Sequence, residues 1–152
     1  MSCRLFFALR PPAPVRESLL LLMEQVDGAR WQDDDQLHLT LRYLGETDER
    51  TAEDIADAAR HIAFSPFDIS IEGCSYFEKK GVPRQLYTRV RPDDRLSALH
   101  KKLDRICVKC GIEPERRKFV PHITLARLNQ SSGPLGTFLT RHGAANLGPW
   151  RV

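Results

Sequence analysis

A short pattern of four residues occurs twice in this chain: a histidine, an apolar residue, a threonine and a second apolar residue. The two copies are His38–Leu41 and His122–Leu125, and their histidines are 84 positions apart (122 minus 38). Over eight residues, five positions are identical or nearly so: the histidine, the Leu or Ile after it, the threonine, the next leucine and the leucine in seventh place. We therefore expect a repeated structural unit. If its two halves face each other, two imidazoles and two hydroxyls converge on one site.

The composition is that of an ordinary globular protein. The chain has 152 residues, of which 41% are hydrophobic and 28% charged, which fits one domain or two small lobes that share a core. The net charge of +3 is compatible with a polyanionic partner but does not by itself indicate one. The four cysteines are too scattered for a disulfide framework, and no signal peptide or membrane-spanning apolar run is present. We therefore expect a cytoplasmic location and no membrane partner.

Apolar periodicity predicts the elements of the N-terminal half. A short buried strand is expected at 4–9, followed by a helix over 15–26 whose apolar residues recur at helical spacing. Residues 37–44 alternate as a strand that Gly45 closes. A second helix is expected to open at 47–49 with N-cap chemistry and to run to about residue 63.

The C-terminal half contains mostly strand patterns around one long helix. The predicted elements are a strand at 67–73, a turn at 78–83, a strand at 85–90, a helix from 92 to a cap at Gly111, a strand at 119–128 and a strand at 147–152. The turn is expected to join antiparallel strands. This order predicts an α+β protein of two pseudo-equivalent lobes.

Both repeated stretches lie in predicted strands. Because alternate side chains of a strand point to the same side, His38 and Thr40 share a face and lie roughly 7 Å apart. The same alternation places His122, Thr124 and Ala126 on one face of the second strand. Each strand can therefore present a histidine and a threonine to one ligand.

Two histidines and two threonines suit the cleavage of a phosphoester. The reaction needs a base for water and an acid for the leaving oxygen, and imidazole can be either because its ordinary pKa is about 6.5. Threonine hydroxyls can donate hydrogen bonds to the non-bridging oxygens, and a nearby arginine, Arg42 or Arg127, can neutralise the developing charge. A strained ester such as a five-membered cyclic phosphate requires no metal.

Three segments resemble the 2H phosphoesterase superfamily, and most closely its RNA 2′,3′-cyclic phosphodiesterases, also named 2′-5′ RNA ligases. The segments are 4–9, 37–46 and 119–127. The resemblance implies a bilobal, pseudo-symmetric α+β fold, in which antiparallel sheets line a central cleft and helices pack outside. It also implies that residues 1–152 form a single domain of two lobes, without the further C-terminal strand structure that family members usually have.

The same resemblance implies roles for individual residues. His38 and His122 are the expected catalytic pair, Thr40 and Thr124 the expected phosphate contacts, and Arg127 an additional phosphate contact. The implied reaction opens a terminal 2′,3′-cyclic phosphate to a 2′-phosphate, with His122 as the base on water and His38 as the acid for the leaving 3′-oxygen. The reverse reaction, 2′-5′ ligation, would use the same residues in exchanged roles. We expect a monomer that acts on RNA ends or small cyclic nucleotides and uses no cofactor or metal.

Two other functions are compatible with these residues. One is a nucleotide- or RNA-binding module that uses the same cleft without catalysis. The other is a metal site built from His38 and His122, although two histidines without a carboxylate or cysteine on the same strand faces make a poor ligand set. Turnover of a nucleoside 2′,3′-cyclic phosphate in EDTA would separate catalysis from both.

Several weaker signals have a structural explanation that we favour. Cys107–Cys110 has redox or zinc spacing, but no second pair accompanies it, so we expect packing inside a helix. The charged run 115–118 and the basic residues of the hairpin at 79–84 are either solvated loops or contacts with an RNA backbone. Stacking on a base is an alternative to burial in the core for three aromatic residues: Phe6, Phe7 and Tyr43.

Overall fold

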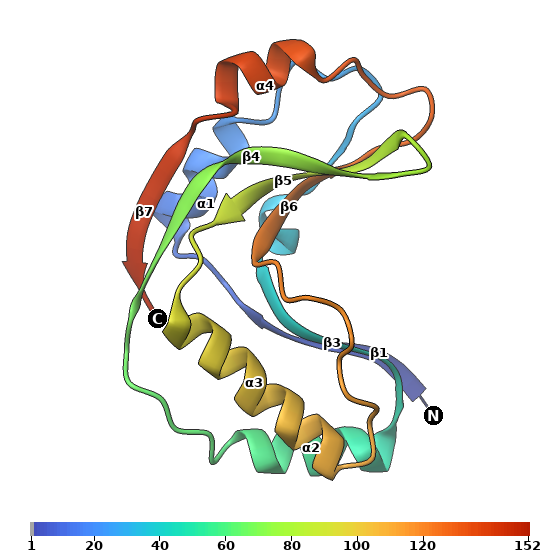
Figure 1. Ribbon diagram of the computed structural model, residues 1–152, viewed down its shortest axis with the longest axis vertical. Coiled ribbons are helices and arrows are strands. Elements are labelled where there is room, and N and C mark those ends of the chain that lie inside the picture. Colours follow the sequence, from blue (N-terminus) through green and yellow to red (C-terminus); the bar gives the residue numbers. More distant parts are fainter. Residues whose placement is uncertain (1) are drawn as a thin grey trace. The chain divides into compact units, whose positions relative to one another are not determined.

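The computed structural model describes residues 2–152 and contains both helices and strands. In chain order its elements are β1 (Ser2–Leu9), α1 (Ala13–Leu21), β2 (Arg30–Trp31), the 3₁₀ turn η1 (Asp34–Gln36), β3 (Leu39–Asp48), α2 (Glu49–Ala59), β4 (Asp68–Lys79), β5 (Val82–Val90), α3 (Asp94–Lys109), β6 (His122–Arg127), α4 (Gly136–His142) and β7 (Asn146–Arg151). Figure 1 shows these elements along the chain. The predicted α+β class with antiparallel strand pairing is confirmed.

The chain divides into two compact units. Unit 1 contains the N-terminal strand together with Thr40–Phe67 and Pro92–Val120. Unit 2 contains Arg10–Leu39, Asp68–Arg91 and Pro121–Val152. Each unit therefore combines segments that are distant in the sequence.

Unit 2 is built on an antiparallel sheet in which β6, β5, β4 and β7 follow one another and β2 pairs with the other side of β6. The β4–β5 hairpin turns at Lys80 and Gly81, whose φ angles of 53° and 78° are the left-handed conformations that a tight hairpin requires. One face of this sheet is apolar and buried, and Leu86, Ile123 and Leu125 are fully enclosed there. The hydrophobic effect of burying this face holds the unit together.

Helices cover the apolar face of the unit 2 sheet. Trp31 of β2 packs against Phe138 of α4, with ring centroids 6.1 Å apart, and Phe138 is fully buried. On α1, Val15 and Leu19 are buried as the periodicity predicted. This helix ends at Leu21, however, and not at Val26. Leu21 is 80% exposed, and the chain leaves the helical path after it. Val26 is buried all the same, because it reaches the core from the segment that follows the helix.

Unit 1 consists of the paired strands β1 and β3 with the helices α2 and α3. The N-cap chemistry predicted for α2 is confirmed, because Asp48 accepts a hydrogen bond from the Thr51 amide. At the start of α3, Asp93 accepts one from the Arg95 amide. On α3, Leu96, Leu99, Leu103 and Cys107 are buried, whereas Ile106 is half-buried. The α2 helix ends at Ala59, four residues earlier than predicted.

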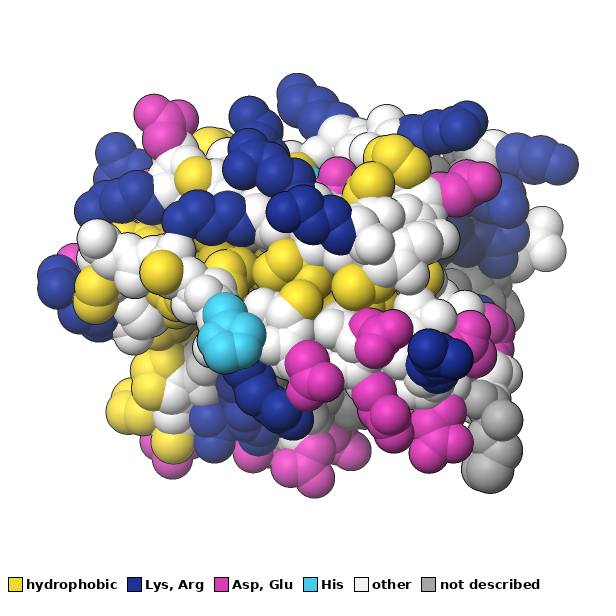
Figure 2. All heavy atoms as spheres, turned by 90° about the horizontal axis from the view of Figure 1, so that it is seen from below, with side chains coloured by type: hydrophobic (Ala, Val, Ile, Leu, Met, Phe, Trp, Pro, Cys, Tyr) yellow, Lys and Arg dark blue, Asp and Glu magenta, His cyan; other side chains and the backbone are white. Residues whose placement is uncertain are grey.

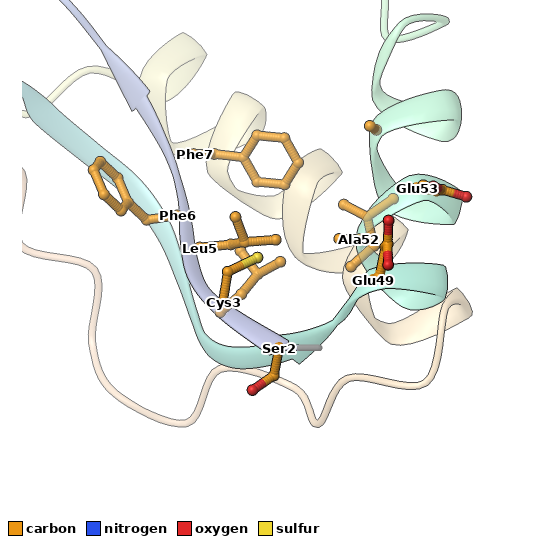
Figure 3. A pocket seen from close by; sticks show the side chains of 11 residues that line it. Ser2, Cys3, Leu5, Phe6, Phe7, Glu49, Ala52 and Glu53 are labelled. Atoms are coloured by element: carbon orange, nitrogen blue, oxygen red, sulfur yellow. The ribbon is translucent and has the colours of Figure 1, made fainter.

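The prediction of a buried N-terminal strand is wrong. Every residue of β1 that follows Met1 is exposed or half-buried, and Phe6 is 47% exposed. Leu5 and Phe7 point toward α2 and line an apolar pocket of about 560 Å³, whereas Phe6 extends to the other side of the strand (Figure 3). The apolar sequence of β1 reflects its position at the edge of the sheet, beside this open pocket.

The two helices of unit 1 carry opposite charges. Acidic residues dominate α2, and the exposed side of α3 is rich in lysine and arginine. Figure 2 shows the acidic and basic side chains gathered in separate areas with apolar side chains between them. The residues that line the apolar pocket include no histidine of the repeated stretches.

Three elements were not predicted from the sequence: β2, η1 and α4. A strand of two residues and a helix of seven are too short to give a clear period. The strands also differ from their predicted bounds, since β3 continues past Gly45 to Asp48 and β4 continues to Lys79. The second motif strand begins only at His122, because Pro121 lacks the amide that the strand ladder would use.

Candidate functional site

The β6 strand presents His122 and Thr124 on the open face of the unit 2 sheet. In the register, Arg89 of β5 lies opposite His122, and Tyr87 lies opposite Thr124. Directly opposed residues point to the same face. Ile123 and Leu125 point to the other face and are fully buried, whereas His122 and Thr124 are half-buried. The alternation predicted for these four residues is therefore present.

A β-bulge changes the alternation after Thr124. Tyr87 pairs with Thr124 and Leu86 with Ala126, so that Leu125 is the extra residue. Leu125 and Ala126 are both fully buried, and Arg127 is exposed. The prediction that Ala126 shares a face with His122 and Thr124 is wrong, because the bulge places Arg127 there instead.

His38 is held at the entry to β3 by the turn that precedes it. Asp33 and Gln36 form a capping box around η1, in which each side chain accepts a hydrogen bond from the other residue's backbone amide. Arg10 donates hydrogen bonds to the carbonyl oxygens of Asp34 and Asp35, at 3.1 and 3.0 Å. These contacts fix the backbone from which the imidazole of His38 extends.

The register places His38 on the same face as the β6 residues. Leu39 pairs with Ile123, and both are fully buried. In an antiparallel pair one step before Leu39 corresponds to one step after Ile123, so His38 lies beside Thr124 on the opposite, open face. Unit 2 therefore brings together His38, His122, Thr124 and Arg127.

The pKa of His38 is lowered from its ordinary value. Burial is the largest cause, and a hydrogen bond with the backbone of Gln36 acts in the opposite direction. The positive charges of Arg10 and of protonated His122 lower the pKa further. The two imidazoles are therefore close enough to influence each other's protonation, and His38 favours its neutral form at pH 7.

Aromatic rings surround His122. The ring centroids of Phe77 and Tyr87 lie 5.0 and 5.3 Å from that of the imidazole, both edge-on, and the two aromatic rings stack on each other at 4.2 Å. Tyr87 is buried and Phe77 half-buried. These contacts limit the orientations of the imidazole. Neither Phe77 nor Tyr87 was among the aromatic residues that the sequence suggested for the site, which were Phe6, Phe7 and Tyr43.

Gln85 contacts the other motif residue of β6. Its side-chain amide donates a hydrogen bond to the hydroxyl oxygen of Thr124. A hydroxyl that accepts such a bond must direct its own proton elsewhere. Thr124 is thereby prepared to donate to an anion on the open face.

The arginine near the first repeated stretch has a structural role. Arg42 is 5% exposed and forms an ion pair with Asp104, its Nε lying 2.9 Å from the carboxylate. It also donates to the carbonyl oxygens of Tyr43 and Glu113. The suggestion that Arg42 neutralises charge on a phosphate is therefore wrong. Thr40 is half-buried on β3, where the strand enters unit 1.

Two of the other histidines take part in packing, whereas His61 is exposed. His100 stacks on Phe119 and contacts the carbonyl oxygen of Leu41, and His142 contacts the carboxylate of Glu24 at 3.0 Å. Within residues 2–152, no three side chains of His, Cys, Asp or Glu gather into a group that could hold a metal ion. Over the same residues, no helix has the length and apolar character needed to cross a membrane.

The chain is similar to known proteins along most of its length. Residues 13–134 match the model of the 2′-5′ RNA ligase superfamily. An RNA 2′,3′-cyclic phosphodiesterase of Thermotoga maritima is 38% identical over 109 residues, which are 70% of this chain and 58% of the relative. One of the same name from Archaeoglobus fulgidus is 26% identical over 98% of this chain and 86% of the relative.

Solved structures give the same result. A protein of Thermus thermophilus matches 99% of this chain and 84% of its own, with a TM-score of 0.73 and 25% identity. Escherichia coli LigT complexed with 3′-AMP matches 84% of this chain and 74% of its own, with a TM-score of 0.72 and 27% identity. A two-histidine phosphoesterase fold is thus present, and the chain belongs to the 2′-5′ RNA ligase superfamily. The resemblance inferred from the repeated stretches is confirmed.

Proposed function

We propose that this protein hydrolyses the 2′,3′-cyclic phosphate ends of RNA or small nucleotides to 2′-phosphomonoesters by acid–base catalysis with His38 and His122. The observation that carries the proposal is the pair of imidazoles on one face of unit 2, where each affects the other's charge. The names of the relatives from Thermotoga maritima and Archaeoglobus fulgidus support the substrate class.

In the proposed reaction, water attacks the phosphorus atom while His122 takes its proton. The bond from phosphorus to the 3′-oxygen breaks, and protonated His38 gives its proton to that oxygen. Thr124 and Arg127 stabilise the charge on the non-bridging oxygens, with Thr40 as a further contact. If a 5′-hydroxyl attacked the cyclic phosphate in place of water, the bond from phosphorus to the 3′-oxygen would break in the same way and the product would be a 2′-5′ phosphodiester.

The lowered pKa of His38 fits this assignment. A group with a lowered pKa gives up its proton readily, so His38 is a strong acid toward the leaving oxygen once it is protonated. The negative charge of a bound phosphate favours that protonation. Binding of substrate thus favours the protonated His38 that the proposed reaction requires.

Product analysis tests the proposal. An oligoribonucleotide with a 2′,3′-cyclic end is incubated with the protein in EDTA, and the position of the phosphate in the product is determined. We expect a 2′-phosphate and a free 3′-hydroxyl. A 3′-phosphate product would overturn the proposed geometry. Tight binding without turnover would support the alternative, a non-catalytic nucleotide- or RNA-binding module.

A further inference from the structure

Two arginines lie side by side on the open face of the unit 2 sheet, beyond the histidines. Arg30 of β2 pairs directly with Arg127 of β6, and Arg127 pairs with Gln85 of β5. Directly opposed residues share a face and have Cβ atoms roughly 4.5–5.5 Å apart. Both arginines are exposed.

Like charges in directly opposed positions destabilise a sheet unless something neutralises them. Among residues 2–152, neither Arg30 nor Arg127 forms an ion pair or a side-chain hydrogen bond. Unit 2 provides a contrast in Arg10 and Arg16, which both bind the carboxylate of Asp34. Between Arg10 and Arg16 the protein itself supplies the neutralising anion, the carboxylate of Asp34, whereas the described residues supply none between Arg30 and Arg127.

The position of the arginine pair fits a second phosphate. From Tyr87, opposite Thr124, to Gln85, opposite Arg127, is two residues along β5, which is roughly 7 Å by the rise of a strand. Successive phosphates of one nucleic acid strand are separated by a comparable distance. Paired guanidinium groups bind phosphate well because their N–H groups match its oxygens.

We propose that Arg30, together with Arg127, binds the phosphodiester on the 5′ side of the terminal nucleotide, so that the preferred substrate is an oligoribonucleotide and not a mononucleotide. This inference rests on the proposed function, since it assumes that the cyclic phosphate lies at His38 and His122. Arg127 lies between the two phosphates and contacts both. Arg30 contacts only the upstream phosphodiester and sets the preference for a longer strand.

Three substrates test the proposal: a nucleoside 2′,3′-cyclic phosphate, a dinucleotide with a cyclic end, and the same dinucleotide with an uncharged methylphosphonate linkage. We expect kcat/KM of the natural protein to be on the order of tenfold higher for the ordinary dinucleotide, the size of one charge-assisted hydrogen bond. Arg30→Gln should remove this advantage without changing turnover of the nucleoside. It should have no further effect on the methylphosphonate substrate.

Arg141→Gln is the matched control. It removes one positive charge from α4, which packs on the opposite face of the sheet through Phe138 and Trp31. We expect this variant to keep the preference for the dinucleotide. Equal losses on the nucleoside and the dinucleotide in Arg30→Gln, or no loss on either, would overturn the assignment.

A binding measurement separates this proposal from the proposed function. If the natural protein turned over none of the three substrates, the proposed function would fail, but the arginine site could still be tested. A fluorescein-labelled RNA with a 3′-phosphate is titrated with protein at several salt concentrations and followed by anisotropy. Arg30→Gln should weaken binding about tenfold and reduce the salt slope by roughly one. Unchanged affinity and slope would refute the site.

Discussion

The two His-x-Thr-x stretches have nearly the same sequence but different surroundings. His38 stands at the entry to its strand, where the capping box of η1 and the hydrogen bonds of Arg10 fix the backbone. His122 is the first residue of β6, and Phe77 and Tyr87 lie against its ring. Equivalent imidazoles can thus be positioned by a polar turn in one case and by aromatic packing in the other.

The arginines that follow the stretches differ even more. Arg42 follows its threonine by two residues and is enclosed with Asp104, whereas Arg127 follows its threonine by three and is exposed. The bulge at Leu125 moves the alternation of β6 by one residue and places Arg127 on the open face, whereas Arg42 is held by Asp104. The similarity of the two stretches therefore does not extend to the surroundings of the arginines that follow them.

The largest expected effect concerns the histidines. His38→Ala and His122→Ala should each reduce kcat for a nucleoside 2′,3′-cyclic phosphate by roughly 10²–10⁴-fold, since each removes one positioned proton transfer. Steady-state kinetics measures the loss, and circular dichroism verifies that the variants are folded. If the two stretches contribute equally to chemistry, the two losses should be similar. Full activity in either folded variant would exclude that histidine from catalysis.

Replacing Arg42 should mainly lower stability, and replacing Arg127 should mainly lower activity. Arg42→Ala leaves the carboxylate of Asp104 without its partner and should lower the free energy of unfolding by roughly 3 kcal/mol. Arg127→Ala should change the free energy of unfolding by no more than about 0.5 kcal/mol and reduce kcat/KM on the order of 10²-fold. Urea denaturation and steady-state kinetics measure the two quantities. Similar profiles for the two variants would contradict the distinction between a structural and a functional arginine.

Much of the site was predictable from the sequence because the motif is local. The repetition of His and Thr in two strand patterns predicted four site residues, and the alternation predicted for His122 and Thr124 is present. The position of Arg127 on the site face was not predictable by alternation, because a bulge depends on how β6 pairs with β5. Phe77, Tyr87 and Gln85 were missed for the same reason: they reach β6 residues only through strand pairing.

The fold shows the same division between local and non-local information. Helix starts were correct where an aspartate caps the helix, as at Asp48 and Asp93, since capping involves neighbouring residues. The end of α1 was wrong because the apolar period continues to Val26 although the helix does not. The exposure of β1 was also missed, since an apolar run does not show whether a strand is central or at an edge.

The hydrogen bond of Gln85 provides a smaller test of how the sheet prepares β6. Gln85→Leu removes the donor that orients the hydroxyl of Thr124, and kcat/KM should fall roughly tenfold at most, the range of one hydrogen bond. In a Thr124→Val background the same change should have no further effect. Thr124→Ser keeps the hydroxyl and is the control. Additive losses in the double variant would show that Gln85 acts independently of Thr124.

The smallest effect is expected on the pKa of His38. The positive charge of Arg10 disfavours protonation of this ring, so Arg10→Gln should raise the pKa of His38 toward its ordinary value. With His38 as the acid, the alkaline limb of kcat/KM should then move to higher pH, and NMR titration of the imidazole should show the same direction.

Arg10→Lys is the control, because it keeps the charge but loses the forked hydrogen bonds to η1. If the charge is responsible, the lysine variant keeps the lowered pKa; if the fixed turn is responsible, both variants shift alike. The comparison thus determines whether the first stretch depends on its polar turn for position alone or also for protonation.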